Sequence, residues 1–264
     1  MMTSSELRLE ARKSLTGKWG KAALLMLVYA LITFTIGFVL NLIPTVGRLI
    51  SFVIDLPISY GLIVSLIKLK RGEEISYTGF LNDGFNSFKQ VWIVFGNMLL
   101  KLIIPFCLVV VFAIIMAVGG AGTIAGAAYG SSRAAAGLGG VAIIGIIGYL
   151  VTLIWLTVKS YLYSLSFFIL YDNGEKSGKE IVAESESLMR GNRWKYFWLP
   201  FTFIGWIILA AFSFGIGYLW LAPYMLVTLV CFYEDLAGKK NEVEVKASTE
   251  EAPVIENENN TTEQ

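Results

Sequence analysis

Long apolar runs separated by short polar stretches constrain this chain more than any other feature. Six runs can be read, at residues 22–43, 49–69, 92–118, 141–171, 199–214 and 217–233. A helix needs about 20 apolar residues to cross a hydrocarbon core of about 30 Å. The third and fourth runs exceed that length, so these helices should tilt or continue out of the bilayer. We therefore predict an all-α fold, a polytopic membrane helical bundle of about six transmembrane helices.

Polar segments at both ends flank a single membrane domain. Residues 1–21 carry five Lys and Arg side chains, and no small-residue cleavage site follows them. We expect a cytoplasmic amphipathic arm here rather than a signal peptide. Residues 22–237 form the membrane domain. Residues 238–264 are acidic and polar, a composition that predicts a disordered cytoplasmic tail.

One order of residues recurs along the chain: a basic or amphipathic stretch, a Trp, two apolar runs joined by a turn, then Gly and two charges. The Trp residues are Trp19, Trp92 and Trp194, and the closing triplets begin at Gly72, Gly174 and Gly238. This order predicts three helical hairpins. Internal triplication would relate them by an axis along the membrane normal. Coincidence is the alternative, because Trp, Gly and Lys concentrate at membrane interfaces in any case.

The distribution of Lys and Arg predicts the orientation. The N-terminal arm holds five, the 68–90 loop four, the 173–198 loop five and the tail three, whereas the connections between them hold one each at most. The positive-inside rule then places both termini in the cytoplasm.

Two cytoplasmic segments carry the capping-box spacing that begins a helix, at Thr3 with Glu6 and at Ser177 with Glu180. We expect their apolar faces to lie in the membrane interface, with Trp and basic side chains at headgroup level. Docking of a partner is the alternative. The expected interfacial anchors are Trp19, Trp92, Arg190, Arg193, Trp194 and Lys195.

Residues 119–140 are rich in Gly and Ala. Gly122, Gly126 and Gly130 have the GxxxG spacing of closely packed helices. Ser and Arg at 131–133 interrupt the pattern, and Gly weakens a helix exposed to water. Of the two interpretations, a flexible outside loop is favoured over a packing motif.

Chemistry-bearing motifs are absent from the sequence, which has no His, no GxSxG, no HExxH and no CxxC. We interpret the acidic pairs Glu73-Glu74 and Glu234-Asp235 as solvated surface groups. Cys107 and Cys231 lie in apolar runs and are expected to be inert thiols. The sequence thus favours a non-enzymatic protein with no cofactor and no metal. A net charge of +1 gives no reason to expect nucleic acid as a partner.

Three charged residues fall inside the apolar runs: Asp55, Lys101 and Lys159. Charges within a membrane are costly and often mark ion or substrate paths. The alternative is that all three lie at the interface, the lysines extending to the headgroups.

Short motifs in a fixed order resemble the uncharacterised bacterial family known as domain of unknown function number 975. They are Leu7-Arg8-x-x-Ala11-Arg12-x-x-Leu15-x-Gly17-x-Trp19, Ser187-Leu188-Met189-x-Gly191-Asn192, Phe203-Ile204-Gly205-Trp206, Gly215-Ile216-Gly217, Pro223-Tyr224 and Phe232-Tyr233. The similarity covers about residues 4–236. It departs in the fourth run, where members of that family carry Ile-Pro-Gly and this chain has Ile146-Ile147-Gly148. The 120–140 insertion also looks peculiar to this chain.

The resemblance implies a multi-pass protein of the bacterial plasma membrane, mainly of Gram-positive bacteria, with no established activity. Two functions from different classes remain. The preferred one is a non-enzymatic envelope or accessory protein that contacts membrane lipids or a membrane protein partner. The other is a small transporter or channel with a polar path through Asp55, Lys101 and Lys159 between hairpins. The oligomeric state stays open.

Overall fold

A computed structural model describes residues 2–43 and 45–250 of the 264-residue chain. All regular structure in this part is helical. The elements are α1 (Ser4–Leu15), α2 (Trp19–Asn41), α3 (Val46–Arg71), α4 (Gly79–Asn86), α5 (Phe88–Ala128), α6 (Ser132–Ser160), the 3-10 turn η1 (Tyr161–Tyr163), α7 (Ser166–Asp172), α8 (Gly178–Met189), α9 (Arg193–Phe201), α10 (Ile204–Phe212) and α11 (Tyr218–Glu250). Six helical stretches are long and apolar enough to cross a membrane, which confirms the predicted all-α membrane fold.

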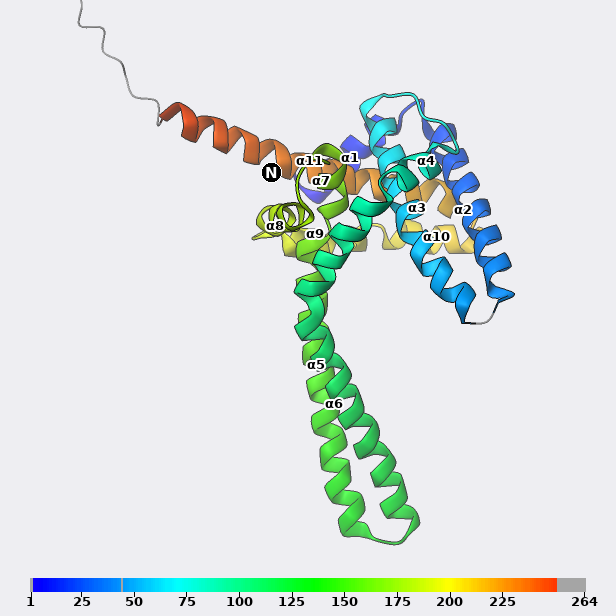
Figure 1. Cartoon of the computed structure of the whole chain (residues 1–264), viewed down its shortest axis with the longest axis vertical. Helices are drawn as coiled ribbons and strands as arrows, with labels where there is room; N and C mark the ends of the chain where they lie inside the picture. Colours follow the sequence, from blue (N-terminus) through cyan, green and yellow to red (C-terminus); the bar gives the residue numbers. More distant parts are fainter. Residues whose placement is uncertain (1, 44, 251–264) are drawn as a thin grey trace, which may run out of the picture.

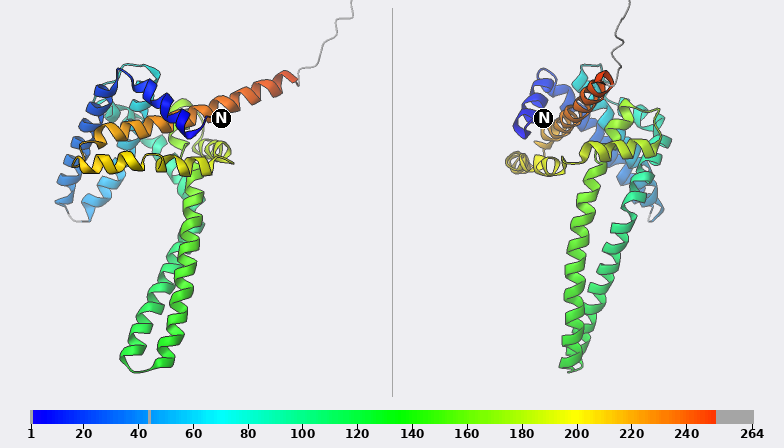
Figure 2. Two further views of the ribbon diagram at one scale, coloured as in Figure 1. Left: turned by 180° about the vertical axis from the view of Figure 1, so that it is seen from behind. Right: turned by 90° about the vertical axis from the view of Figure 1, so that its left-hand side faces the viewer.

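The spans pair in sequence order as α2 with α3, α5 with α6, and α10 with α11. They do not stand as parallel copies, however. Figures 1 and 2 show α5 and α6 extending far beyond the turn between α2 and α3, while α10 and α11 run across the direction of α5 and α6. The fifth span is also interrupted, because α9 ends at Phe201 and α10 begins at Ile204.

The packed core lies at one end of the hairpins, where α1, α4, α7 and α8 gather around α3 and α11. Of the apolar window of α11, 56% is buried, against 11% for that of α5. Large apolar side chains on the rest of α5 and α6 are exposed, as on the outer part of α2. We call the packed end the base. Hydrocarbon is the medium that suits the exposed apolar surface of the remaining helices.

Both capping boxes are present. In α1 the Thr3 N–H donates to the Glu6 carboxylate at 2.6 Å, and the Glu6 N–H donates to the Thr3 hydroxyl at 3.3 Å. Ser177 and Glu180 do the same in α8. Gly17 and Gly191 follow the two helices with φ of +76° and +82°, a conformation that costs Gly little.

The apolar faces of α1 and α8 pack inside the protein. Leu7, Ala11 and Leu15 of α1 are 0% exposed, and Ile181 and Val182 of α8 are each 1% exposed. The prediction that these faces lie in the lipid interface is therefore wrong. The amphipathic pattern predicts correctly that one face of each helix is buried, but it does not specify what covers that face.

The Gly-rich segment is helical, so the predicted flexible loop is wrong. Helix α5 continues to Ala128 and α6 begins at Ser132, with Gly130 at φ +69° in the short turn. A Cβ atom on Gly119 would lie 2.5 Å from the Ala142 nitrogen, and one on Gly126 would lie 2.8 Å from the Ala135 nitrogen. The missing side chains let the two backbones touch, and this contact offsets the low helix propensity of Gly.

The predicted tail also begins as helix. Helix α11 continues through residue 238 to Glu250, so disorder is wrong for 238–250, and it extends away from the rest of the molecule (Figure 1). A helix already nucleated in the membrane domain adds further residues at little cost. The predicted disorder of 251–264 lies outside the described residues.

Candidate functional site

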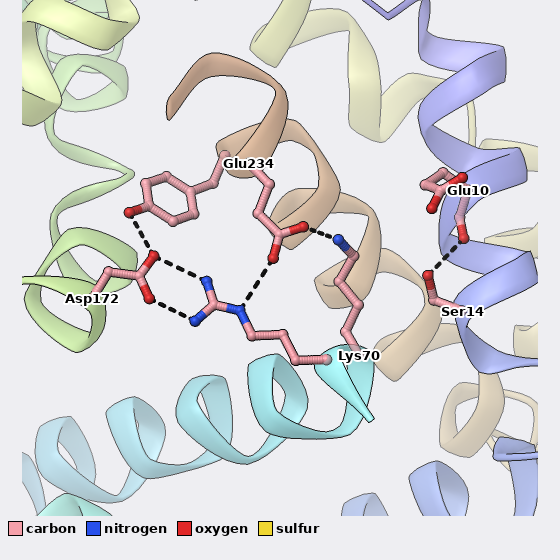
Figure 3. A network of polar contacts seen from close by, with 7 residues as sticks. Glu10, Ser14, Lys70, Asp172 and Glu234 are labelled. Atoms are coloured by element: carbon pink, nitrogen blue, oxygen red, sulfur yellow. Dashed lines mark hydrogen bonds and ion pairs between the residues drawn. The ribbon is translucent and has the colours of Figure 1, made fainter. Parts of the chain in front are cut away.

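A cluster of charged side chains joins the C-terminal ends of α3 and α7 to the middle of α11 in the base (Figure 3). Arg71 donates to both oxygens of Asp172, at 2.7 and 3.0 Å, and its Nε donates to Glu234 at 3.3 Å. The Tyr233 hydroxyl donates to Asp172 at 2.9 Å, and Lys70 pairs with Glu234. We call these five residues the ionic cluster. It holds the last turns of α3 and α7 against the middle of α11, although these segments lie far apart in sequence.

The ionic cluster combines residues that the sequence placed near the closing triplets. Arg71 directly precedes Gly72, Asp172 lies two residues before Gly174, and Glu234 lies four before Gly238. The interpretation of Glu234 as a solvated surface group is wrong, because it accepts from Lys70 and Arg71. A recurrence of charges before each closing Gly was the available signal. The first hairpin ends in the bases Lys70 and Arg71, whereas the second and third carry the acids Asp172 and Glu234, so the first hairpin attracts the other two.

Beside the cluster, Asp235 fastens the N-terminal arm to α11. Its carboxylate accepts from the Met2 N–H at 3.0 Å and lies 4.0 Å from the Lys195 ammonium. The Tyr224 hydroxyl donates to the Arg8 carbonyl at 3.2 Å, and Arg8 in turn donates to the Thr202 carbonyl at 3.0 Å. The first helix is thus held by the last.

The structure does not bring Asp55, Lys101 and Lys159 together. Lys101 on α5 lies 3.9 Å from Glu186 of α8, with 56% of its side chain exposed, and the Lys159 ammonium lies 5.3 Å from the ring centre of Trp155. Helices α5 and α6 pack antiparallel in a constant register, in which Gly119 faces Ala142 and Gly145 faces Met116. If the same register continues toward the base, Lys101 and Lys159 face each other at the same height.

Lys101 and Lys159 would then lie at the same height, where the α5–α6 hairpin leaves the base. This placement fits the hypothesis that both lysines lie at the membrane interface better than the hypothesis of a shared polar path. From Leu102 to Ala128, α5 holds 27 residues, which at 1.5 Å each extend about 40 Å, more than the hydrocarbon core of about 30 Å.

The expected interfacial anchors occupy different surroundings. The Trp19 ring lies edge-on to Tyr224 at 5.9 Å, and the Trp92 ring contacts Phe52 at 5.8 Å. Arg190 pairs with Glu186 one turn earlier on α8 at 3.0 Å. Arg193 and Trp194 line a pocket of about 560 Å³ against α6. Lys195, as noted, approaches Asp235.

Asp55 lines a groove of about 840 Å³ between α2, α3 and the segment 215–222. It lies nine residues after the start of α3 and sixteen before its end at Arg71, so roughly 14 and 24 Å of helix separate it from the two ends. A charged carboxylate this deep in a span costs about 2.5–3.5 kcal/mol on insertion scales. Pro57, Tyr60 and Gly61, on the next turns of α3, are buried.

Among the described residues, no group of three His, Cys, Asp or Glu is placed to hold a metal ion. Cys107 is exposed and Cys231 is buried, and the two thiols are free. The ionic cluster pairs each acid with a base or a hydroxyl donor, which suits it to joining helices rather than to proton transfer.

Comparison with known proteins identifies a family and no closer relative. A family model described as "Protein of unknown function (DUF975)" matches residues 1–240. No curated protein and no solved structure matches the chain.

Proposed function

Since the chain belongs to the family of unknown function DUF975, we propose its role from its own geometry: a non-enzymatic accessory protein of the bacterial plasma membrane. The observation that carries this proposal is the separation of two surfaces. The base holds the packed core and the ion pairs, whereas the outer parts of α2, α5 and α6 carry exposed apolar side chains. Such a molecule is suited to present a fixed surface at the membrane to lipids or to a membrane protein partner.

The base gathers the segments richest in Lys and Arg, which by the positive-inside rule favours a cytoplasmic base with both termini on that side. Absence of His and of recognised catalytic motifs from the sequence supports a non-enzymatic role. Two pockets combine an arginine with aromatic and apolar walls, one at Arg12 and Trp19 and the other at Arg193 and Trp194. This chemistry suits the headgroup and first carbons of an anionic lipid.

Native co-isolation tests the accessory role. The tagged chain is extracted from its own membranes in a lipid-preserving polymer, and co-isolated proteins and lipids are identified by mass spectrometry. We expect a partner protein or an enriched anionic lipid that is reduced in Arg193→Gln, with Arg190→Gln as control because Arg190 lines neither pocket. A wild-type isolate with the bulk lipid composition and no partner would contradict the proposal.

Transport along a path shared by Asp55, Lys101 and Lys159 has weaker support, because the three side chains belong to separate surroundings. Lys159→Met should accordingly leave abundance and any phenotype of the gene unchanged. Loss of phenotype at normal abundance would instead favour a transporter.

A further inference from the structure

The groove at Asp55 combines one carboxylate with aromatic and apolar walls, and the accessory role makes no use of this combination. Of the residues that line it, Asp55 alone is charged, and the others are aromatic, hydroxyl-bearing, amide or apolar residues. Its volume of about 840 Å³ lies in the range of small-molecule sites, about 300–1,000 Å³, far larger than a single bare ion requires.

The Asp55 carboxylate has no hydrogen bond or ion pair with any described residue. Four of the polar residues that line the groove form hydrogen bonds elsewhere, and the other two, Ser51 and Tyr218, form none with Asp55. The Thr33 hydroxyl donates to the Tyr29 carbonyl at 2.8 Å, and the Asn41 amide donates to the Gly37 carbonyl at 2.8 Å. The Tyr29 and Ser59 hydroxyls lie 3.3 Å apart and bond to each other. The carboxylate thus lacks a protein donor.

Arg48 does not serve as its counter-charge. It lies two turns earlier on α3, about 10 Å along the helix axis, and no ion pair joins it to Asp55. A carboxylate inside an apolar span without a partner is favoured only if something else neutralises it. The groove leaves room for that group beside Asp55.

The lining selects the class of ligand. Tyr29, Phe34 and Tyr218 offer aromatic faces, which attract organic cations, and Gly37 and Ala222 leave space for an apolar body. We propose that this groove binds an amphiphilic organic cation, its charge beside Asp55 and its apolar part between α2 and the segment 215–222. This site does not depend on the accessory role, since none of its lining residues belongs to the ionic cluster or to the two pockets that contain Arg12 and Arg193.

Binding of tetraphenylphosphonium to the full chain tests the proposal. The purified protein is placed in phosphatidylcholine nanodiscs, and radiolabelled probe bound to empty nanodiscs is subtracted. We expect saturable binding that dodecyltrimethylammonium displaces and that sodium chloride does not. Asp55→Asn should weaken it by at least about tenfold, and Asp55→Glu should retain it. Glu175→Gln is the matched control, an acid-to-amide change at an exposed residue outside the groove.

Folding is followed separately through Cys231, which is 3% exposed in the base. The proposal would be overturned if the Asp55→Asn variant keeps Cys231 protected from maleimide and still binds the probe as the wild type does. So would equal binding of the anion tetraphenylborate, which would show plain apolar partition, or displacement by sodium, which would show an inorganic cation as occupant.

A second measurement needs no Asp55 variant. Phe34 is 72% exposed and lines the groove. In a Cys107→Ser background, Phe34→Cys should react with maleimide more slowly when tetraphenylphosphonium is present. An unchanged reaction rate would also overturn the proposal, even if Asp55→Asn failed to fold.

Discussion

Arg71 joins partners that are 101 and 163 positions away in sequence, Asp172 and Glu234. Its planar guanidinium bonds to both carboxylates at once, because two N–H groups donate to Asp172 and a third donates to Glu234. About one-third of its side chain, 33%, is exposed, so solvent screens part of the attraction. A lysine keeps the positive charge at this position but loses the planar arrangement of N–H donors that reaches both carboxylates.

Arg71→Lys should therefore lower the free energy of unfolding by about 1–2 kcal/mol. The measurement is maleimide modification of Cys231 in a Cys107→Ser protein during heating or detergent unfolding. Arg190→Lys is the matched control, because Arg190 makes a pair within one helix and its side chain is 70% exposed. We expect an effect below about 0.5 kcal/mol there. Equal losses in the two variants would deny the ionic cluster a joining role.

The capping box of α1 gives a pH dependence. The Thr3 backbone N–H, followed by the Thr3 side chain, stabilises the Glu6 carboxylate and lowers the pKa of Glu6 below its ordinary 4.5. A lowered folded-state pKa adds stability above the unfolded-state value and loses it as pH falls through the folded one. Comparing thermal midpoints, wild type should exceed Glu6→Gln at neutral pH, with the difference shrinking below about pH 4.5. A constant difference down to pH 3 would exclude this charge effect.

Single residues show where sequence reasoning works and where it ends. The capping boxes depend on neighbours three positions apart, so the sequence predicted both of them. The partner of Glu234 is 164 positions away at Lys70, and no local pattern specifies it. A charge in an apolar run is visible in the sequence, so Asp55 is predictable, but its groove depends on how segment 215–222 meets α2 and α3.

At the scale of elements, the α5–α6 hairpin shows what small residues do. Its glycines either touch the facing helix or point into open space. A Cβ atom on Gly145 would lie 2.5 Å from the Met116 nitrogen, whereas one on Gly120 would meet nothing within 4 Å. The sequence showed the spacing, but flexible loops and helix seams share this composition. Only the facing backbone decides between them.

Gly119→Ala and Gly120→Ala form a matched pair on neighbouring residues. The first places a methyl group against the Ala142 backbone, which should cost about 1–3 kcal/mol or splay the hairpin. The second fills open space and should be neutral or slightly stabilising, since Ala is the better helix former by about 0.8–1.0 kcal/mol. Thermal unfolding in nanodiscs compares the two. A greater loss of thermal stability in Gly120→Ala than in Gly119→Ala would contradict the close packing of α5 against α6 at Gly119.

Helix α8 provides the second element-scale prediction. Leu188 is 8% exposed and packs into the base, so Leu188→Glu loses roughly 1.5–3 kcal/mol of apolar burial and also buries a charge. Membrane yield and Cys231 protection should both fall. Ala183→Glu introduces the same side chain on the exposed face of α8 and should change neither. Loss of yield in both variants would instead indicate a general intolerance of added charge.

At the scale of the whole molecule, the sequence predicted the number and pairing of the spans and not their arrangement. Hydropathy is a property of each run, so the six runs could be counted. Helix α11 crosses the direction of α5 and α6 (Figure 2) because it packs against α1, α2 and α3, and α10 packs against α11. Those contacts arise from side chains spread across the entire chain. Parallel triplication therefore describes the order of the elements and not their placement.

The proposed orientation predicts which positions a membrane-impermeant thiol reagent reaches. In a protein with Cys107→Ser and Cys231→Ser, cysteines at the exposed Ser76 and Ala183 should be labelled only after the cytoplasmic side is opened. A cysteine at the exposed Ser132, the first residue of α6 after the α5–α6 turn, should be labelled in intact cells. Labelling of Ser132→Cys and Ala183→Cys from the same side would rule out this topology.

The contact between the first helix and the last has a consequence in time. Tyr224 donates to Arg8 across 216 positions, so this contact cannot form before α11 has been synthesised. At about 5–20 residues per second, the interval is roughly ten to forty-five seconds. During it the apolar stripe of Leu7, Ala11 and Leu15 has no α11 to cover it. The ribosome, the translocon or the membrane surface must shelter that stripe until the final span arrives.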